Sequence, residues 1–307
     1  MCSTSHPFLD GLKNYPAGKK KDLQKIRSWI ITQAHLPTIS DEYIYLFLHA
    51  CYYNQDRTKQ AIETYFTLRT NTASIFGNRD VDSNKIKTCT EIAHIIRLPK
   101  DTPEGYKVLM YSVKDTDYTK LVFADAVKGF CMFNDCILSE DGLAEGYVVL
   151  FDMKGLALGH IARVSLPALK AFMVYIQEAH PARLKAVHVL NTANYINHIM
   201  RIVIPLIRSE LISIVKFHKG NVPEGFPVEI MPKDYGGEAP STTELDGHTL
   251  SLMTKYKQWL LDSETFRVDE SRRVKKASWW SLLSGSNQTA QALEEQNKTL
   301  FQNLQID

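Results

Sequence analysis

The chain contains two different patterns of hydrophobic and polar positions, and the first is helical. Apolar residues recur every three to four positions within 23–31, 43–48 and 62–68, which is the spacing of amphipathic helices. Pro37 separates the first two runs, and Ser40 precedes two acidic residues that suit the N-terminus of a helix. These features predict a small bundle of three helices before residue 73.

From Cys89 onward, short apolar runs of strand length alternate with longer helical segments. The expected strands are 92–98, 106–113, 147–151, 186–190 and 215–218. The expected helices are 121–138, 165–180, 194–214 and 245–261, and the Pro- and Gly-rich segment 222–240 is expected to be an irregular loop. Strands that alternate with helices are typical of an α/β sheet with crossover connections.

The expected helix at 194–214 is apolar over most of its circumference. Its main stripe consists of Ile196, Ile199, Met200, Val203, Leu206 and Ile207, while Ile202 and Ile204 lie outside the stripe. A helix of this kind is usually buried on two sides. The alternative is a lid that closes an apolar cavity with one face and presents the other to a membrane. Pro205 is expected to bend or end the helix, which is compatible with both interpretations.

Composition restricts the function without choosing it. The 307 residues are 44% hydrophobic and carry a formal charge of only +2, which argues against disorder and against nucleic acid as the general partner. No apolar run approaches the roughly 20 residues of a spanning helix. No apolar stretch precedes Lys19, Lys20 and Lys21, and five cysteines without a CxxC pair are typical of reduced thiols. We therefore expect a soluble, cytoplasmic protein.

Catalytic and metal-binding patterns are missing from the sequence. It contains no GxSxG, GxxxxGK[ST], GxGxxG or HExxH motif. The histidines are not spaced as zinc ligands are, and Cys131 and Cys136 have no obvious charged neighbour that would activate them. The sequence therefore predicts no enzyme, no metal and no cofactor.

Several segments, in this order, resemble the CRAL-TRIO lipid-binding family, which includes tocopherol and retinaldehyde carriers. The matching segments are 147–155, the run 180–191 that begins His-Pro-Ala-Arg-Leu, Ile204-Pro205 and 231–238. In addition, 46–54 resembles the three-helix module that precedes the family's domain. The resemblance covers about residues 20–261 and leaves the C-terminal tail unexplained.

The resemblance implies an α/β fold with a three-helix N-terminal module and a mixed sheet that floors an apolar cavity. A lid helix at 194–208 is expected to close this cavity over one hydrophobic ligand, with no covalent chemistry. The implied organisation is a flexible N-terminus at 1–18, the helical module at 19–85, the CRAL-TRIO domain at 86–262 and a basic, aromatic tail at 263–307.

The resemblance also implies the residues that line the cavity, although each of them could equally be ordinary core. The candidate ligand-binding residues are Val127, Phe130, Cys131, Asn134, Tyr147, Val149, Phe151, Phe172, Tyr175, Ile176, Val187, Val189, Ile199, Met200, Val203, Leu206 and Ile207. Asn134 differs from the others because a buried amide needs a partner. It is expected to bind a ligand hydroxyl or carbonyl, or to bond to the backbone.

Basic and aromatic residues form a second, weaker set of candidates for contact with phosphoinositides or a membrane. They are Arg183, Lys185, Arg201, Arg208, Lys216, Arg272, Arg273, Lys275, Lys276, Trp279 and Trp280. Where family members carry basic residues after the lid, this chain has Glu210, Ile212 and Ile214, which makes release triggered by phosphoinositides doubtful. The tail combines basic charge with interfacial aromatics, but it could instead pack back onto the domain.

The expected function is that of a carrier for one small hydrophobic molecule, such as a tocopherol, retinoid, carotenoid or other isoprenoid. The carrier would move this molecule between membranes, with transient contact to a membrane surface that could include anionic lipid. A phospholipid or phosphatidylinositol exchange protein is the main alternative within the family. A phosphoinositide-responsive adaptor is the alternative from another class.

Overall fold

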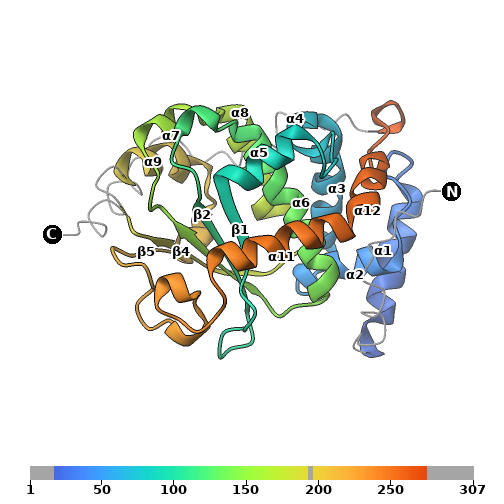
Figure 1. The fold of residues 1–307 in the computed structure, drawn as a ribbon. Coiled ribbons are helices and arrows are strands. Elements are labelled where there is room, and N and C mark those ends of the chain that lie inside the picture. The colour runs from blue at the N-terminus through green and yellow to red at the C-terminus, as the bar shows by residue number, and fades with distance from the viewer. Residues whose placement is uncertain (1–16, 193–195, 275–307) are drawn as a thin grey trace.

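A computed structural model describes residues 17–192 and 196–274, and its N-terminal part is the expected helical bundle (Figure 1). The bundle consists of α1 (Lys20–Thr32), α2 (Asp41–Ala50) and α3 (Gln55–Asn71). The Ser40 hydroxyl accepts the backbone N–H of Tyr43 at 3.4 Å, so Ser40 is the predicted N-cap of α2.

Two further helices connect the bundle to the first strand. They are α4 (Ala73–Phe76) and α5 (Asn84–Ile92). The sequence analysis missed α5, although Ile86, Cys89 and Ile92 recur every three residues and are all buried. The boundary predicted between residues 85 and 86 falls inside this helix.

The predicted strands pair into one mixed sheet of five strands. The strands are β1 (Ala93–Arg97), β2 (Lys107–Val113), β3 (Tyr147–Asp152), β4 (Leu184–Leu190) and β5 (Val215–Phe217). They lie in the order β1-β2-β3-β4-β5, with β1 antiparallel to β2 and all other pairs parallel. The parallel part follows from the crossover helices that connect its strands.

The two faces of the sheet pack against different parts of the chain. One face carries Val108, Met110, Val148 and Leu150, which pack with Ile230, Met231 and Leu245 from the loop after β5 and from the following helix. The other face carries Leu109, Tyr111, Tyr147 and Val149. This separation is the two-residue alternation of side chains along a strand.

The second face of the sheet lies beneath a layer of helices. These are α6 (Phe123–Asp141), α7 (Leu158–Ala162) and α8 (Leu166–Val174), with a π-helical turn at Tyr175–Ala179 that continues α8. The strand β1 forms one edge of the sheet, and α11 (Thr242–Lys255) packs along it. The helix α12 (Lys257–Asp262) follows α11. Short 3-10 helices cover Ala17–Lys19, Tyr118–Lys120, Ile204–Leu206, Val228–Ile230, Lys233–Tyr235, Ser263–Thr265 and Glu270–Arg272.

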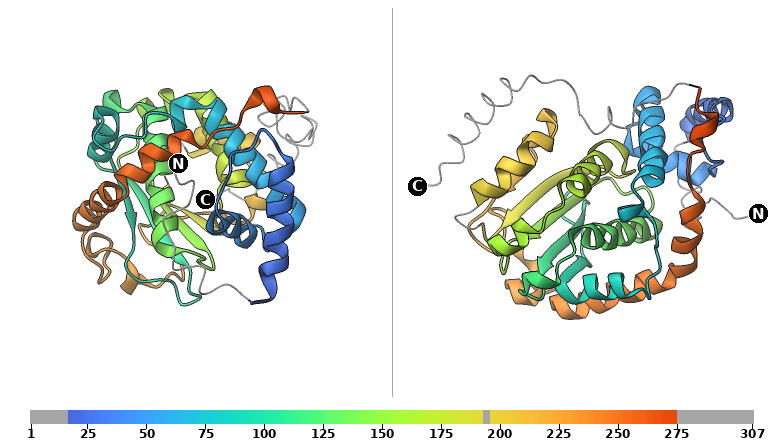
Figure 2. Two further views of the ribbon diagram at one scale, coloured as in Figure 1. Left: turned by 90° about the vertical axis from the view of Figure 1, so that its right-hand side faces the viewer. Right: turned by 90° about the horizontal axis from the view of Figure 1, so that it is seen from above.

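The prediction of one continuous helix over 194–214 is wrong. The described part of this segment is divided into α9 (Ile196–Val203), the 3-10 turn Ile204–Leu206 and α10 (Ser209–Ile212). Pro205 is the reason, because its ring fixes the backbone and it cannot donate the hydrogen bond that would continue α9. Figures 1 and 2 show α9 at the end of the molecule opposite the N-terminal bundle.

A buried ionic cluster joins three distant parts of the chain. Asp135 on α6 accepts from Arg69 on α3 at 3.2 Å and from Arg79 at 2.5 Å. Both arginines also donate to the hydroxyl of Ser263, which follows α12, at 3.2 and 2.7 Å. All four side chains are almost fully buried. The cluster therefore holds the N-terminal bundle and the C-terminal segment against α6.

Candidate binding cavity

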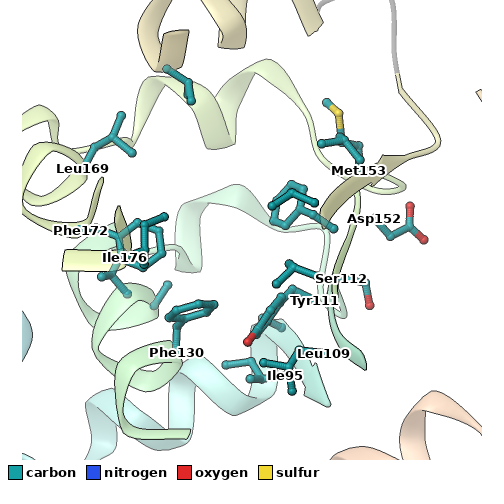
Figure 3. Close-up of a pocket in the computed structure, with 18 of the residues that line it drawn as sticks. Ile95, Leu109, Tyr111, Ser112, Phe130, Asp152, Met153, Leu169, Phe172 and Ile176 are labelled. Atoms are coloured by element: carbon teal, nitrogen blue, oxygen red, sulfur yellow. The ribbon is translucent and has the colours of Figure 1, made fainter. Parts of the chain in front are cut away.

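An apolar cavity of about 530 Å³ lies between the second face of the sheet and the helices that cover it. Its walls come from β1 to β5 on one side and from α6, α8 and α9 on the others. Figure 3 shows Tyr111 on the sheet with Phe130 on α6, and Phe172 and Ile176 at α8, arranged around this space. The apolar face of the sheet and the apolar faces of the helices do not meet here, and the space between them is the cavity.

Most of the predicted ligand-binding residues line this one cavity. They are Val127, Phe130, Asn134, Tyr147, Val149, Phe151, Phe172, Ile176, Val187, Val189, Ile199, Met200, Val203 and Ile207. They come from six elements between residues 127 and 207. The structure therefore brings them together, while their contact with a ligand stays a prediction.

Three predicted residues do not line the cavity. Cys131 lies on the side of α6 that packs against the N-terminal bundle. Tyr175 is fully buried against Tyr65 and Phe76, with ring centroids 5.9 and 5.0 Å away. Leu206 lies in the 3-10 turn at Pro205, where the change in helical phase removes it from the stripe predicted for a continuous helix.

The lining residues that were not predicted from the sequence are more than twice as many as those that were. They include Ile95, Leu109, Tyr111, Leu169, Met173, Ile196, Ile202, Leu211 and Ile214. Ile95, Leu109 and Tyr111 occupy alternate positions of β1 and β2, so the same two-residue pattern that identified β3 could have found them. Ile202 could not be found in this way, because the helical stripe excluded it.

The segment from α9 to α10 forms one wall of the cavity. Ile199, Met200 and Val203 line the cavity from α9, and Arg201 on the same helix is exposed. The 3-10 turn is fixed to α8 by the amide of Gln177. This amide donates to the carbonyl oxygen of Leu206 at 2.9 Å and accepts the backbone N–H of Arg208 at 2.7 Å.

Most polar side chains that line the cavity are paired within the protein. Asn134 donates to the carbonyl oxygen of Phe130 at 2.8 Å and to the hydroxyl of Tyr111 at 3.1 Å. Tyr147 donates to the carboxylate of Asp141 at 3.2 Å. Of the two expected roles of Asn134, the structure thus provides the bond to the backbone.

His180 begins the link from α8 to β4 and also lines the cavity. Its Nδ1 lies 3.1 Å from the hydroxyl of Tyr175. Burial lowers the pKa of His180 to about 4, so the ring is neutral at pH 7. No other acceptor for the Tyr175 hydroxyl occurs among the described residues, so this hydroxyl donates to Nδ1 and the ring proton lies on Nε2.

Charge is distributed unevenly around the cavity. None of its lining residues in the described part of the chain is Lys or Arg. Among the acidic lining residues, Asp152 bonds to Tyr235 at 2.5 Å and to Asn191 at 2.7 Å, and its side chain points away from the enclosed space (Figure 3). Asp115 is half-buried and pairs with Lys120 at 2.5 Å. The cavity thus offers no fixed cation to an anionic group.

Two basic residues that the resemblance assigned to phosphoinositides lie beside the N-terminal bundle. Arg183 is buried, donates to the carbonyl oxygen of His49 at 2.9 Å and pairs with Glu145 at 3.0 Å. Its guanidinium also lies 4.2 Å from the ring centroid of Tyr52. These contacts make Arg183 part of the interface with the bundle. Lys185 bonds to the hydroxyl of Tyr52 at 3.2 Å.

The other predicted membrane-contact residues lie on the segment from α9 to α10, on β5 and near the C-terminus. Arg201 and Lys216 are exposed, whereas Arg208 pairs with Glu210 at 2.7 Å. Arg272 is exposed, but Arg273 is 5% exposed and bonds to Glu63, Glu270 and Thr67. Arg273 therefore packs against α3. Lys275, Lys276, Trp279 and Trp280 lie outside the described residues.

The buried thiols are unreactive in character. Burial raises the pKa of Cys89 to about 12 and raises the pKa values of Cys131 and Cys136 well above their ordinary range. Within 17–192 and 196–274, no three His, Cys, Asp or Glu side chains come together as metal ligands. Across the same residues, no helix has the length and apolar character needed to cross a membrane.

The fold and the site define a mixed α/β protein with an apolar cavity between its sheet and its helices. Residues 93–237 match the CRAL/TRIO domain, and residues 16–86 match the Pinta-like UBA domain. The chain therefore contains a CRAL/TRIO domain, the domain of a family of lipid-binding and lipid-transfer proteins.

Individual relatives are distant. The chain is 24% identical over 251 residues to the human alpha-tocopherol transfer protein-like protein, which covers 78% of this chain and 72% of the relative. It is 22% identical over 235 residues to clavesin-1 of Xenopus laevis, covering 75% and 71%. The crystal structure of Sfh5 aligns with a TM-score of 0.45 at 12% identity, covering 78% of this chain and 97% of that one.

Proposed function

We propose that this protein is a cytoplasmic carrier that encloses one small, uncharged, hydrophobic molecule and transfers it between membranes. A tocopherol, retinoid, carotenoid or other isoprenoid has the required character. The observation that carries this proposal is the cavity of about 530 Å³, whose walls are almost entirely apolar. The protein binds its ligand without converting it and needs no cofactor or metal.

The charge of the cavity favours this proposal over phospholipid exchange. A phosphate buried away from water needs cationic partners, because burying an unpaired charge costs several kcal/mol. The lining residues of the described chain include no Lys or Arg that could supply them. A phospholipid would therefore have to leave its headgroup outside the cavity.

The lid provides the route for release at a membrane. Burying about 400 Å² of apolar ligand surface is worth on the order of 10 kcal/mol, so escape into water is slow. When α9 opens, its apolar face can enter a bilayer while exposed Arg201 meets the headgroups. The protein therefore associates with membranes transiently, and nucleic acid is not a partner.

The direct test is native mass spectrometry of the purified protein, followed by solvent extraction of whatever it carries. A carrier gives a protein mass increased by one small lipid, and the extract identifies the lipid. If the protein stays empty after incubation with vesicles that contain tocopherol, retinol and squalene, the proposal fails. An extract that contains only phospholipid supports the exchange protein instead.

A second test separates the lid from ordinary core packing. Val203→Asp places a carboxylate against the apolar wall and is expected to reduce retention of bound diphenylhexatriene, an uncharged fluorescent hydrocarbon, at least tenfold. Arg201→Asp is the matched control, because it introduces the same side chain on the exposed side of α9. Equal retention by both variants would contradict the assignment of Val203 to the wall.

A further inference from the structure

We infer that His180, held in place by Tyr175, is the residue that recognises the oxygen atom of the ligand and so selects a hydroxyl- or carbonyl-bearing lipid over a hydrocarbon. This inference rests on the proposed function, because it names the chemical class that the cavity prefers.

The ring of His180 presents a donor that no described protein group uses. Its Nδ1 accepts from Tyr175 at 3.1 Å, which leaves the proton on Nε2, and no hydrogen bond of the described residues involves Nε2. The ring is enclosed by protein, yet the residue keeps accessible surface and lines the cavity. The oxygen of a ligand that enters the cavity can accept this proton.

The other deep polar groups are already occupied. Asn134 uses its amide on Phe130 and Tyr111, and Gln177 uses both ends of its amide on the lid backbone. His180 differs from Asn134 and Gln177 because its Nε2–H donor has no partner among the described residues.

His160 is the comparison within the same cavity. Its Nδ1 accepts the backbone N–H of Ala157 at 3.0 Å, so its Nε2 also carries a proton. Its ring lies beside that of Tyr118, with centroids 6.1 Å apart, and Tyr118 is 44% exposed. His160 is itself 5% exposed, so it is a second histidine donor at the cavity. His180 differs from it because its Nδ1 is held by the buried hydroxyl of Tyr175 and not by a backbone N–H.

Tyr175 acts through His180 as a positioning residue. It is fully buried among aromatic rings of the N-terminal bundle, so its hydroxyl is fixed in space. By donating to Nδ1, this hydroxyl selects the tautomer that carries the proton on Nε2. Because the ring is neutral and the cavity has no cation, the preferred ligand is an alcohol, aldehyde or ketone and not a carboxylate.

The test uses three matched lipids of one carbon skeleton: phytanol, phytanic acid and the alkane phytane. Each displaces diphenylhexatriene from the full-length protein, and the displacement curves give relative affinities. We expect the wild type to prefer phytanol to both of the others. His180→Phe is expected to weaken phytanol binding about 3- to 10-fold while leaving phytane binding unchanged or tighter.

Control variants make the outcome specific. Tyr175→Phe is expected to lower the ratio of phytanol to phytane affinity and to shift the ¹⁵N signals of the His180 ring toward a mixture of tautomers, which a purely structural role would not do. His160→Phe removes the same group from α7 and is expected to keep the preference. Loss of the preference in His160→Phe, or its survival in His180→Phe, overturns the inference. Failure of the wild type to bind diphenylhexatriene refutes the proposed function instead.

Discussion

At the scale of single residues, the structure shows that several side chains predicted to contact a membrane or a ligand have their partners inside the protein. Arg183 and Arg273 appear in the sequence as basic residues available to a membrane, but both are buried and paired with nearby acidic residues. Cys131 and Tyr175 lie on helices that line the cavity but face the N-terminal bundle. Composition and spacing cannot show which face of a helix meets which neighbour when both faces are apolar.

The ionic cluster at Asp135 gives a prediction about stability. Asp135→Asn removes the carboxylate that faces Arg69 and Arg79, and leaves two arginines buried without their counter-charge. We expect the free energy of unfolding to fall by about 3–5 kcal/mol, measured by denaturant unfolding. Glu238→Gln is the matched control, because its ion pair with Lys100 is exposed and is worth less than about 1 kcal/mol. Equal effects of the two substitutions would contradict the role of the cluster.

At the scale of elements, the sequence identified all five strands and the three helices of the N-terminal bundle, because their periodicity is strong and caps such as Ser40 mark their ends. It failed at 194–214, where one long helix was expected. The apolar pattern is continuous through 196–207, but Pro205 divides the backbone. Side-chain periodicity reports burial and says little about where a backbone turns.

The π-helical turn that continues α8 gives a prediction about the lid. Gln177 lies in this turn and holds the backbone of Leu206 and Arg208. Gln177→Leu removes both bonds, so we expect the Arg208 amide to exchange its hydrogen about ten times faster and bound ligand to leave sooner. Hydrogen exchange of the empty protein measures the first effect independently of any lipid. Unchanged exchange at Arg208 would show that Gln177 does not hold the lid.

At the scale of the whole molecule, the resemblance predicted the mixed sheet and fourteen of the residues around the cavity from scattered segments. It could not predict the tautomer of His180, because the tautomer depends on the hydroxyl of Tyr175 and on the π-helical turn that places this hydroxyl beside the ring. The fold was thus more predictable than the chemistry of the cavity, since the fold depends on many apolar positions and the chemistry on a few polar ones.

Three histidines with lowered pKa values make the folding stability of the whole protein depend on pH. Burial is the main cause that lowers the pKa values of His49, His180 and His188 to about 4, and nearby His218 further lowers that of His188. The unfolded chain binds these protons near pH 6.5, so stability is complete above pH 6.5 and is lost as the pH falls toward 4. Each histidine contributes a slope of at most about 1.4 kcal/mol per pH unit.

Denaturant unfolding at several pH values between 7 and 5 measures this slope. His188→Phe is expected to reduce it, because one group that binds a proton only in the unfolded state has been removed. A slope identical to that of the wild type would show that His188 is protonated equally in both states.

The cluster around Asp135 also has a consequence for the order in which the protein is completed during synthesis. Arg69, Arg79 and Asp135 are all translated well before Ser263, whose hydroxyl accepts from both arginines in the folded protein. Because α6 is also a wall of the cavity, this wall gains its last support only when about six-sevenths of the chain has been translated. We therefore expect the wall formed by α6 to be completed late in translation.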